Sequence, residues 1–162
     1  MGSFISSKNQ FRADNQQGRL DPYWIVGFVD GEGCFSVSIF KNVTTTSGVQ
    51  VFPEFVVTQG GKSLSVLEKL QTFFECGSIY VNRRKDNHRE DLYRYCVRSI
   101  KDIEGKIIPF FEQYQLKTAK YQDFLIFCQV IDLIKQKKHL TKNGLETVRT
   151  LAGTMNRQKI RS

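Results

Sequence analysis

Two acidic residues, Asp30 and Glu32, end a short segment that also carries regularly spaced glycines. Gly27 and Gly31 are four residues apart, so on an α-helix both lie on one face and leave it without side chains. Because glycine inside a helix costs about 1 kcal/mol relative to alanine, the pattern indicates another backbone packed closely on that face. Glu32 would lie at the C-terminal end of this helix, where the helix dipole disfavours a carboxylate unless a cation neutralises it. A divalent metal ion would supply that charge, so the segment predicts metal-assisted chemistry.

The helix that positions these acids has a clear start and a clear stop in the sequence. Asp21 and Pro22 predict the start, because aspartate caps free N–H groups and proline suits the first helical turn. The helix is expected over Pro22–Asp30. The glycines on both sides of Glu32 favour a tight turn, which is expected to end the helix there.

Strand and helix patterns alternate along the rest of the chain. Pro53 has no N–H to donate, so its strand is expected to be an edge strand or to be bulged there. The expected elements are strands at 34–42 and 49–59, a helix at 63–75 with Gly77 as its stop, strands at 78–84 and 92–99, and helices from about 101, restarting at 109, at 118–137 and at 141–155. This order predicts an α+β domain with one antiparallel sheet.

Residues Ile25–Gly33, with the sequence IVGFVDGEG, resemble the LAGLIDADG motif of the homing endonucleases. The glycine and acid positions of the motif are filled by Gly27, Asp30, Glu32 and Gly33, and glutamate is a common variant at the second acid. The order of elements from 21 to about 155 also follows the family's core, and the runs 106–111 and 138–144 are similar to family segments. The resemblance implies the αββαββα LAGLIDADG homing-endonuclease fold, with an antiparallel DNA-binding sheet and C-terminal helices.

The resemblance also implies an activity and an assembly. A family member of this kind is a site-specific DNA homing endonuclease that makes a metal-dependent double-strand break in a long pseudo-palindromic target. Because one motif is present, the chain is expected to act on double-stranded DNA as a homodimer, or to be one half of a larger protein. In the family two motif helices pack together, and the first acid of the motif caps or packs at the interface. The implied interface residues are Trp24, Gly27, Phe28, Asp30 and Gly31.

Hydrolysis of a phosphodiester needs a nucleophilic water, a stabilised transition state and a stabilised leaving oxygen. A hard divalent cation serves all three needs, and Mg²⁺ is expected here, with Mn²⁺ or Ca²⁺ able to substitute. The resemblance implies that Glu32 of each subunit binds the metal, with the backbone carbonyl of Gly31 beside it. It also implies that Gln59 orients solvent and that Lys117 or Lys120 approaches the scissile phosphate or the water. The local alignment does not choose between these lysines, and Lys117 is the preferred one.

The implied DNA-binding sheet would lie in the major groove, where side chains of one face reach base edges. Arginine can bind guanine with two hydrogen bonds, and glutamine or asparagine can bind adenine in the same way. Phe40 and Phe52 would contact a thymine methyl group or a sugar, or else cover an apolar patch under a loop. The period of two predicts these DNA-binding residues: Ser36, Ser38, Phe40, Asn42, Gln50, Phe52, Glu54, Val56, Thr58, Ser78, Tyr80, Asn82, Arg83, Arg84, Arg94, Cys96 and Arg98.

Composition agrees with an anionic partner. The formal net charge is +8, and nearly all the excess of lysine and arginine lies after Asn82. Binding to DNA phosphates would then depend steeply on salt. No apolar run approaches the roughly 20 residues of a membrane span, so no membrane partner is expected. The four cysteines form no CxxC pair and are expected to be reduced and mostly buried, as in an intracellular protein.

Residues 1–18 are expected to form a flexible leader and residues 19–162 a single endonuclease domain. The family suggests an organellar location, in a mitochondrion or a chloroplast, and the small size favours an intron reading frame. Three other functions are compatible with a basic α+β domain: a maturase-like protein that assists RNA splicing, a DNA-binding regulator that does not cleave, and an RNA-binding module. The presence of Glu32 favours cleavage, and the RNP-like aromatic motif and GXXG loop of common RNA-binding modules are missing.

Overall fold

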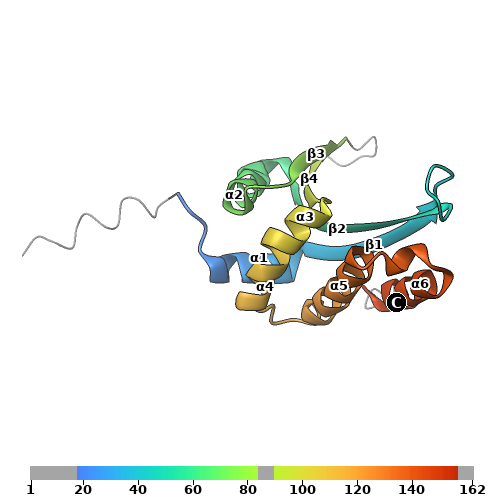
Figure 1. Ribbon diagram of the computed structural model, residues 1–162. Coiled ribbons are helices and arrows are strands. Elements are labelled where there is room, and N and C mark those ends of the chain that lie inside the picture. Colours follow the sequence, from blue (N-terminus) through green and yellow to red (C-terminus); the bar gives the residue numbers. More distant parts are fainter. Residues whose placement is uncertain (1–17, 84–89, 157–162) are drawn as a thin grey trace, which may run out of the picture.

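The structure is a computed structural model that describes residues 18–83 and 90–156, so most of the proposed leader lies outside the described residues. Its elements follow the predicted order of helix, hairpin, helix, hairpin and helices (Figure 1). The elements are α1 (Pro22–Glu32), β1 (Gly33–Lys41), β2 (Val49–Gly60), η1 (Gly61–Ser63), α2 (Leu64–Phe74), β3 (Ser78–Asn82), β4 (Leu92–Val97), α3 (Ile100–Asp102), η2 (Ile103–Ile107), α4 (Ile108–Gln113), α5 (Lys120–Lys135), η3 (Lys138–Leu140) and α6 (Lys142–Thr154). The predicted α+β class is confirmed.

The four strands form one antiparallel sheet in the order β1-β2-β4-β3. β1 pairs with β2 over its whole length, whereas β4 pairs with β2 only from Phe55 to Gly60. Pro53 therefore lies in the part of β2 whose one paired neighbour, within the described residues, is β1. The expectation of an edge position at Pro53 is confirmed, because the missing N–H does not interrupt a ladder on the β4 side.

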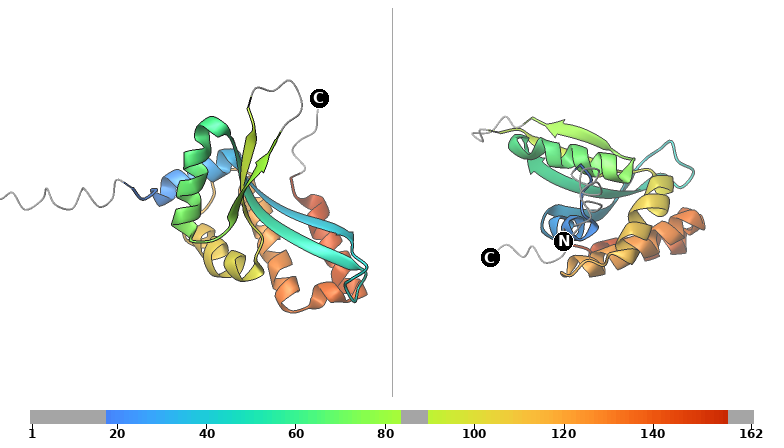
Figure 2. Two further views of the ribbon diagram at one scale, coloured as in Figure 1. Left: turned by 90° about the horizontal axis from the view of Figure 1, so that it is seen from above. Right: turned by 90° about the vertical axis from the view of Figure 1, so that its left-hand side faces the viewer.

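The helices cover one face of this sheet. Seen from above, the β1–β2 hairpin crosses over α5 and α6, which both contact β1 (Figure 2). The face toward the helices carries large aromatic side chains: Phe35 and Phe55 are fully buried, and the Phe35 ring lies 5.5 Å from the ring of Phe111. Burial of each such ring contributes about 2–3 kcal/mol. Since side chains alternate along a strand, the neighbouring residues point to the opposite face of the sheet.

The expected end of the first helix is wrong. α1 continues through Gly31 and Glu32, and Gly33 is the first residue of β1 in an extended conformation (φ −81°, ψ 162°). Gly33 is needed for space, since a Cβ there would lie 2.6 Å from a methyl group of Val29. The expected restart at Pro109 is confirmed to within one residue, since α4 begins at Ile108 with the proline in its first turn. The turns of α3, η2 and α4 follow without a break, because the π-helical turn at Ile103–Ile107 widens the helix just before the proline.

The cysteines are less buried than expected. None of the four forms a disulfide, but only Cys96 is buried and the other three are half-buried. Within the described ranges, no helix is both long enough and apolar enough to cross a membrane.

Candidate functional site

α1 has one anchored face and one open face. The carboxylate of Asp21 accepts a hydrogen bond from the Trp24 N–H at 3.0 Å and caps the start of the helix, as predicted. On the inner face, the apolar side chains of Ile25, Val26 and Val29 are buried. On the outer face Gly27 and Gly31 are exposed, and a Cβ added to either would meet nothing within 4 Å. The outer face therefore has room for a closely packed helix.

Aromatic side chains extend this open face toward the start of α1. The rings of Trp24 and Phe28 stack with their centroids 4.9 Å apart, and Trp24 is 44% exposed. Exposed aromatic surface beside bare glycines is typical of a protein interface rather than of a solvated helix.

Both carboxylate oxygens of Asp30, the first acid of the segment, accept hydrogen bonds from groups of the same chain. One of its carboxylate oxygens accepts a hydrogen bond from the Lys117 N–H at 2.7 Å. The other accepts from the N–H and the hydroxyl of Thr118, the latter at 2.7 Å. Asp30 thus caps the turn that leads into α5, which fits the capping role expected for it, and its carboxylate points to this turn rather than to the outer face.

Lys120 binds the C-terminal end of α1. Its ammonium donates hydrogen bonds to the carbonyl oxygens of Val29 at 2.8 Å and of Asp30 at 3.0 Å. Burial lowers the pKa of Lys120, while nearby acidic groups, among them Glu32, act in the opposite direction. Lys120 therefore supplies part of the positive charge that the carboxylate of Glu32 requires at a helix C-terminus.

Glu32 borders a hollow of about 930 Å³ between α1, β1, α5 and the end of α6. Thr58 of β2 lines the same hollow, which therefore opens beside the sheet face opposite the core. The lining residues that carry polar side chains are Glu32, Cys34, Thr58, Thr118, Lys120, Gln122, Asp123, Thr154 and Asn156. The hollow therefore brings together the carboxylate of Glu32 and the ammonium of Lys120, which come from elements far apart in the chain.

Asn156 fastens the end of α6 to this hollow. Its backbone N–H donates to the carboxylate of Asp123 at 3.0 Å, and its side-chain amide donates to the carbonyl oxygen of Phe35 at 3.0 Å. Asn156 adopts a left-handed conformation (φ 56°), which asparagine tolerates better than most residues. Sequence reasoning missed this residue. Its one signal is an asparagine directly after an amphipathic helix, and many surface turns share that signal.

The carboxylate of Glu32 is the group best suited to bind a metal ion. Within residues 18–83 and 90–156 it has no hydrogen-bond or ion-pair partner, and no group of three or more acidic, histidine or cysteine residues gathers there. One copy of the chain thus offers one free carboxylate together with nearby backbone oxygens. Mg²⁺ fits this small donor set, because it keeps several waters and is commonly held by one or two carboxylates and substrate phosphates.

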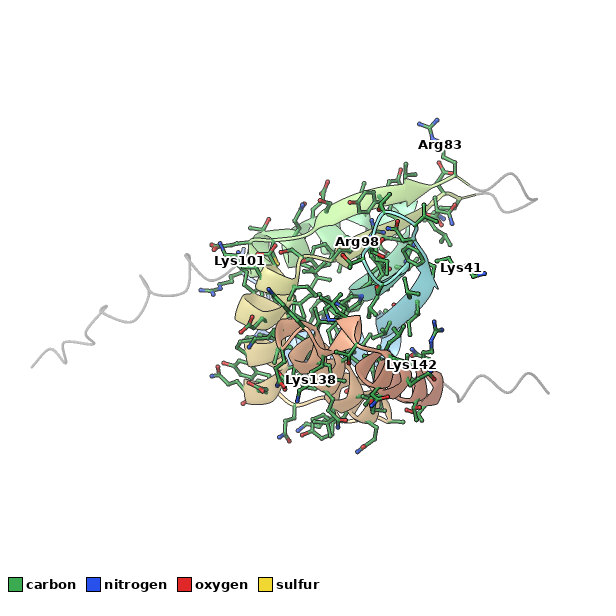
Figure 3. All side chains as sticks on the ribbon, turned by 45° about the vertical axis from the view of Figure 1, so that its right-hand side comes forward. Lys41, Arg83, Arg98, Lys101, Lys138 and Lys142 are labelled. Carbon is green, nitrogen blue, oxygen red and sulfur yellow. The ribbon has the colours of Figure 1, made fainter. Side chains whose placement is uncertain are left out.

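The sheet face opposite the core carries the polar and aromatic side chains that the period of two predicts. The register places Ser36 opposite Glu54 and Ser38 opposite Phe52. It also aligns Thr58, Arg94 and Tyr80 across three strands. Lys41 and Arg98 lie on the sheet side of the molecule, whereas Lys138 and Lys142 lie on the side of the C-terminal helices (Figure 3).

Three of the expected DNA-binding side chains are buried and do not present a surface to a ligand. Val56 and Cys96 are 7% and 2% exposed, and they face each other across β2 and β4. Burial raises the pKa of the Cys96 thiol to about 11. Glu54 is 7% exposed, and its two carboxylate oxygens accept hydrogen bonds from Arg94 at 2.8 Å and Arg98 at 2.5 Å. Alternation identified the face but gave no information on which of its side chains others cover.

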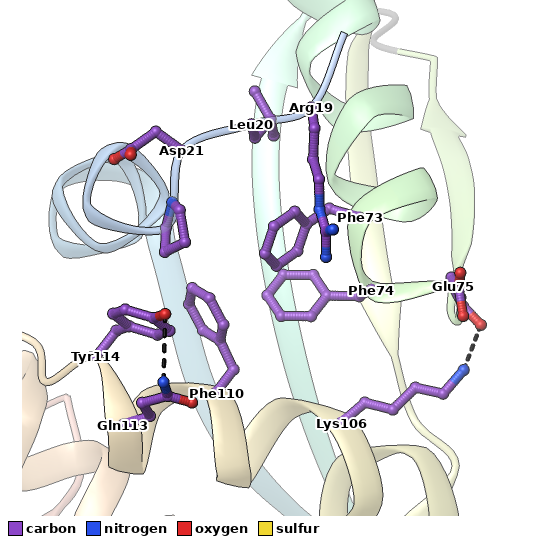
Figure 4. A pocket seen from close by; sticks show the side chains of 11 residues that line it. Arg19, Leu20, Asp21, Phe73, Phe74, Glu75, Lys106, Phe110, Gln113 and Tyr114 are labelled. Carbon is purple, nitrogen blue, oxygen red and sulfur yellow. Dashed lines mark hydrogen bonds between the residues drawn. The ribbon is translucent and has the colours of Figure 1, made fainter. Parts of the chain in front are cut away.

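A second hollow, of about 730 Å³, lies between α2, α4 and the segment before α1 (Figure 4). Phe73, Phe74 and Phe110 line it. The ammonium of Lys106 donates to the carbonyl oxygen of Glu75 at its rim, at 2.6 Å. This hollow shares no lining residue with the one beside Glu32 and holds no catalytic candidate.

A family model described as LAGLIDADG endonuclease matches residues 25–131, which is more than half of the chain. The chain belongs to the LAGLIDADG endonuclease family. Residues Ile25–Gly33 are therefore its LAGLIDADG motif, as the resemblance implied, and the αββαββα fold is confirmed.

Other proteins resemble the chain in sequence and in structure. The uncharacterized 50.9 kDa protein in ND4 intron 1 of Podospora anserina is 39% identical over 125 residues, 76% of this chain and 26% of the relative. The crystal structure of the homing endonuclease I-TnaI superposes with a TM-score of 0.79 and 39% identity over 85% of this chain and 89% of that chain. The I-SmaMI LAGLIDADG homing endonuclease bound to cleaved DNA has a TM-score of 0.76 and 37% identity over 86% of this chain and 45% of that chain.

The chain is much shorter than several of these relatives. It spans about a quarter of the length of the first curated relatives that it matches. It spans just under half of I-SmaMI, which has also been crystallised with uncleaved target DNA in the presence of calcium ions.

The structure distinguishes between catalytic candidates that the LAGLIDADG motif alone left open. Lys120 lines the hollow beside Glu32, whereas the side chain of Lys117 is exposed and only its backbone N–H is used, by Asp30. The stated preference for Lys117 is therefore not supported by the geometry. Gln59 is half-buried and pairs with Tyr93, and its neighbour Thr58 is the β2 residue that lines the hollow.

The structure leaves the side chains of most other predicted DNA-binding residues accessible. The exposed or half-buried ones are Ser36, Ser38, Phe40, Asn42, Gln50, Phe52, Thr58, Ser78, Tyr80, Asn82, Arg83, Arg94 and Arg98. Arg84 lies outside the described residues. Phe40 is 46% exposed, and its ring lies 6.1 Å from that of Phe52, so the two form a small apolar patch on the open face.

Proposed function

We propose that residues 19–162 form one endonuclease domain that cleaves both strands of a long, pseudo-palindromic DNA site as a homodimer. The observation that carries the proposal is the position of Glu32. This carboxylate ends a helix whose outer face is bare, and it borders a hollow that contains Lys120 and opens beside the polar face of the sheet. The proposed dimeric nuclease uses all three features close together: the helix face for assembly, Glu32 with Lys120 for catalysis, and the sheet face for DNA binding.

The proposed dimer packs the outer face of α1 against the same face of a second copy. Gly27 and Gly31 would let the two helix backbones approach closely, and Trp24 and Phe28 would bury their exposed aromatic surface. A twofold axis along this contact brings Glu32 of one copy near Glu32 of the other, because each carboxylate ends its helix. A twofold dimer then presents two equivalent sheets to the two halves of a pseudo-palindromic target.

Double-stranded DNA is the proposed ligand of the open sheet face. The face carries arginine, asparagine, glutamine and serine side chains at alternating positions, and such side chains can bind base edges in the major groove. The net charge of +8 supplies attraction to phosphates and predicts binding that weakens steeply with salt. The I-SmaMI neighbour, crystallised on DNA, supports this assignment for a fold of the same kind.

In the proposed site, the carboxylate of Glu32 and the backbone carbonyl of Gly31 hold Mg²⁺, or Mn²⁺ or Ca²⁺ in its place. The bound cation would activate water and stabilise the charge that develops on the phosphate oxygens. Lys120, fixed by its hydrogen bonds to Val29 and Asp30, directs a positive charge into the same hollow and stabilises the phosphate. Gln59 stays a candidate for orienting solvent.

We also propose an organellar origin for the chain, since relatives carry names that place them in ND4 and cox1 introns. A mitochondrial intron reading frame is the context of this proposal.

Selection for cleavage tests the proposed function directly. The purified chain is incubated with a randomised duplex library in Mg²⁺ buffer, and the cleaved molecules are sequenced. The proposal predicts one long site with approximate twofold symmetry, cut on both strands, and no cleavage in EDTA. Specific binding without cleavage would instead identify a DNA-binding regulator, and the absence of any double-stranded binding, together with binding of intron RNA, would identify a maturase-like protein.

A further inference from the structure

We infer that Arg98 reads a guanine in each half of the target, and that the buried carboxylate of Glu54 positions it for that contact. The inference deepens the proposed function, since it rests on DNA binding by the open sheet face. The alternation along β2 indicates Glu54 as a DNA-contacting residue. We assign it instead to positioning Arg98.

The first step concerns the hydrogen bonds of Glu54. One carboxylate oxygen accepts from the Nε of Arg98 at 2.5 Å, and the other accepts from an Nη of Arg94 at 2.8 Å. Glu54 is 7% exposed, so its charge is paired by these two guanidinium groups and is closed to a base. Glu54 could accept a hydrogen bond from a DNA base only if one of these two ion pairs broke.

The second step concerns the orientation of Arg98. Its guanidinium carbon lies 4.6 Å from the ring centroid of Tyr80 on β3 and 5.5 Å from that of Phe52 on β2. A guanidinium that is hydrogen-bonded along its Nε edge and packed against two rings has lost most of its rotational freedom. The side chain of Arg98 has therefore lost this conformational entropy already in the free protein, before any DNA binds.

The third step concerns the donors that remain. With Nε bound to Glu54, both Nη groups at the tip of Arg98 are available to a ligand, and the side chain is 37% exposed. The two Nη groups match the O6 and N7 acceptors of guanine in the major groove, and the other three bases lack this pair of acceptors. Because the cluster holds two arginines and one glutamate, it keeps a net charge of +1, and approach to DNA stays favourable.

The test compares the base preferences of four proteins: wild type, R98K, E54Q and R149K. Each full chain selects bound duplexes from the randomised library, and the sequences are counted. Arg149 is the matched control, because it is also paired with a glutamate, Glu146 at 3.6 Å, but lies on α6 outside the sheet. Wild type and R149K should select guanine at one position in each half-site. R98K should lose about tenfold or more of that preference, because lysine keeps the charge without the two-pronged geometry.

E54Q separates positioning from direct reading. Loss of the carboxylate should reduce guanine discrimination at the same position severalfold, while overall affinity for DNA stays equal or rises because a negative charge is removed. Replacing that guanine with 7-deazaguanine, which lacks the N7 acceptor, should weaken wild-type binding and leave R98K unaffected. Identical base preferences in wild type and R98K would overturn the inference even if the protein cleaves DNA. Failure of every variant to bind duplex DNA would overturn the proposed function as well.

Discussion

The ammonium of Lys120 lies 3.0 Å from the carbonyl oxygen of Asp30, two residues before Glu32. The relationship is reciprocal, because the carboxylate of Asp30 accepts hydrogen bonds from Lys117 and Thr118 just before α5. Lys120 therefore caps the C-terminus of α1, while Asp30 of α1 holds the turn just before α5. These two contacts hold the ammonium of Lys120 near the end of α1 that carries Glu32, without any direct bond between the two side chains.

Replacing Lys120 with methionine should separate its two roles. The K120M variant keeps an unbranched side chain that is one atom shorter but loses the charge, and we expect single-turnover cleavage to fall by about 100-fold or more. Because the carbonyl groups of Val29 and Asp30 also lose a donor, the free energy of unfolding should fall by about 1–3 kcal/mol. Cleavage under single-turnover conditions and urea unfolding measure the two effects.

Lys117 provides the matched control for this substitution. Its side chain is exposed, and K117M leaves intact the backbone N–H that Asp30 uses. We expect stability close to wild type and cleavage within a few-fold of it. A large cleavage defect in K117M together with a mild one in K120M would reverse the assignment of the two lysines.

The bare face of α1 makes a prediction about assembly. A Cβ at position 27 would have no neighbour within 4 Å, and leucine is a better helix former than glycine. The free energy of unfolding of a single G27L chain should therefore equal that of wild type or exceed it by up to about 1 kcal/mol. The added side chain would hold a second helix away. Sedimentation velocity should therefore show a dimer for wild type and a monomer for G27L.

Gly105 supplies the control for this experiment. It is also an exposed glycine within a helical segment with nothing within 4 Å of an added Cβ, but it lies in η2, away from α1. The G105L variant should stay dimeric. A monomeric wild type, or a G27L variant that still forms the dimer, would contradict assembly through α1.

The buried thiol of Cys96 predicts a specific loss of stability at high pH. Burial raises the pKa of this thiol to about 11 in the folded protein, from the value of 9.0 that an exposed cysteine has in an unfolded chain. Between these values the unfolded state binds fewer protons, so the free energy of unfolding falls as the pH rises. The C96A variant lacks this thiol. Between pH 8 and pH 10 the free energy of unfolding should fall in both proteins, and the fall should be about 1–2 kcal/mol smaller in C96A than in wild type.

Urea unfolding at the two pH values measures this difference, and alkylation of the native protein provides an independent check. At pH 8 the thiol of Cys96 should react with iodoacetamide far more slowly than in the denatured protein. Equal pH dependence in wild type and C96A would show that the thiol is not held in its neutral form by burial.

The order of elements could be predicted because local signals and long-range packing agree. Asp21 and Pro22 begin α1 where the capping rule predicts, and the alternation of Phe35 with Ser36 identifies the two faces of β1. The bare glycine positions could also be predicted, because a four-residue spacing determines a helix face whatever surrounds it.

The parts that could not be predicted depend on contacts between distant residues. The sequence indicates that Gly33 serves a turn. In the structure, glycine is needed there because a Cβ would collide with Val29. The alternation along β2 places Glu54 on the open sheet face. Its burial is explained only by its ion pairs with Arg94 and Arg98, which come from a distant part of the chain. The choice of Lys120 over Lys117 depends on how the start of α5 packs against the end of α1, which is a contact between residues about 90 positions apart.

The central claim is that Glu32 binds the metal ion used to cut DNA, and the E32Q variant tests it most directly. The substitution removes the charge and almost no volume from an exposed helix end, so folding and DNA binding should stay intact. With a plasmid that carries the selected site, in Mg²⁺ buffer, wild type should give linear product while E32Q gives none and still shifts the same site in a gel. Linear product from E32Q at the wild-type rate would contradict the account.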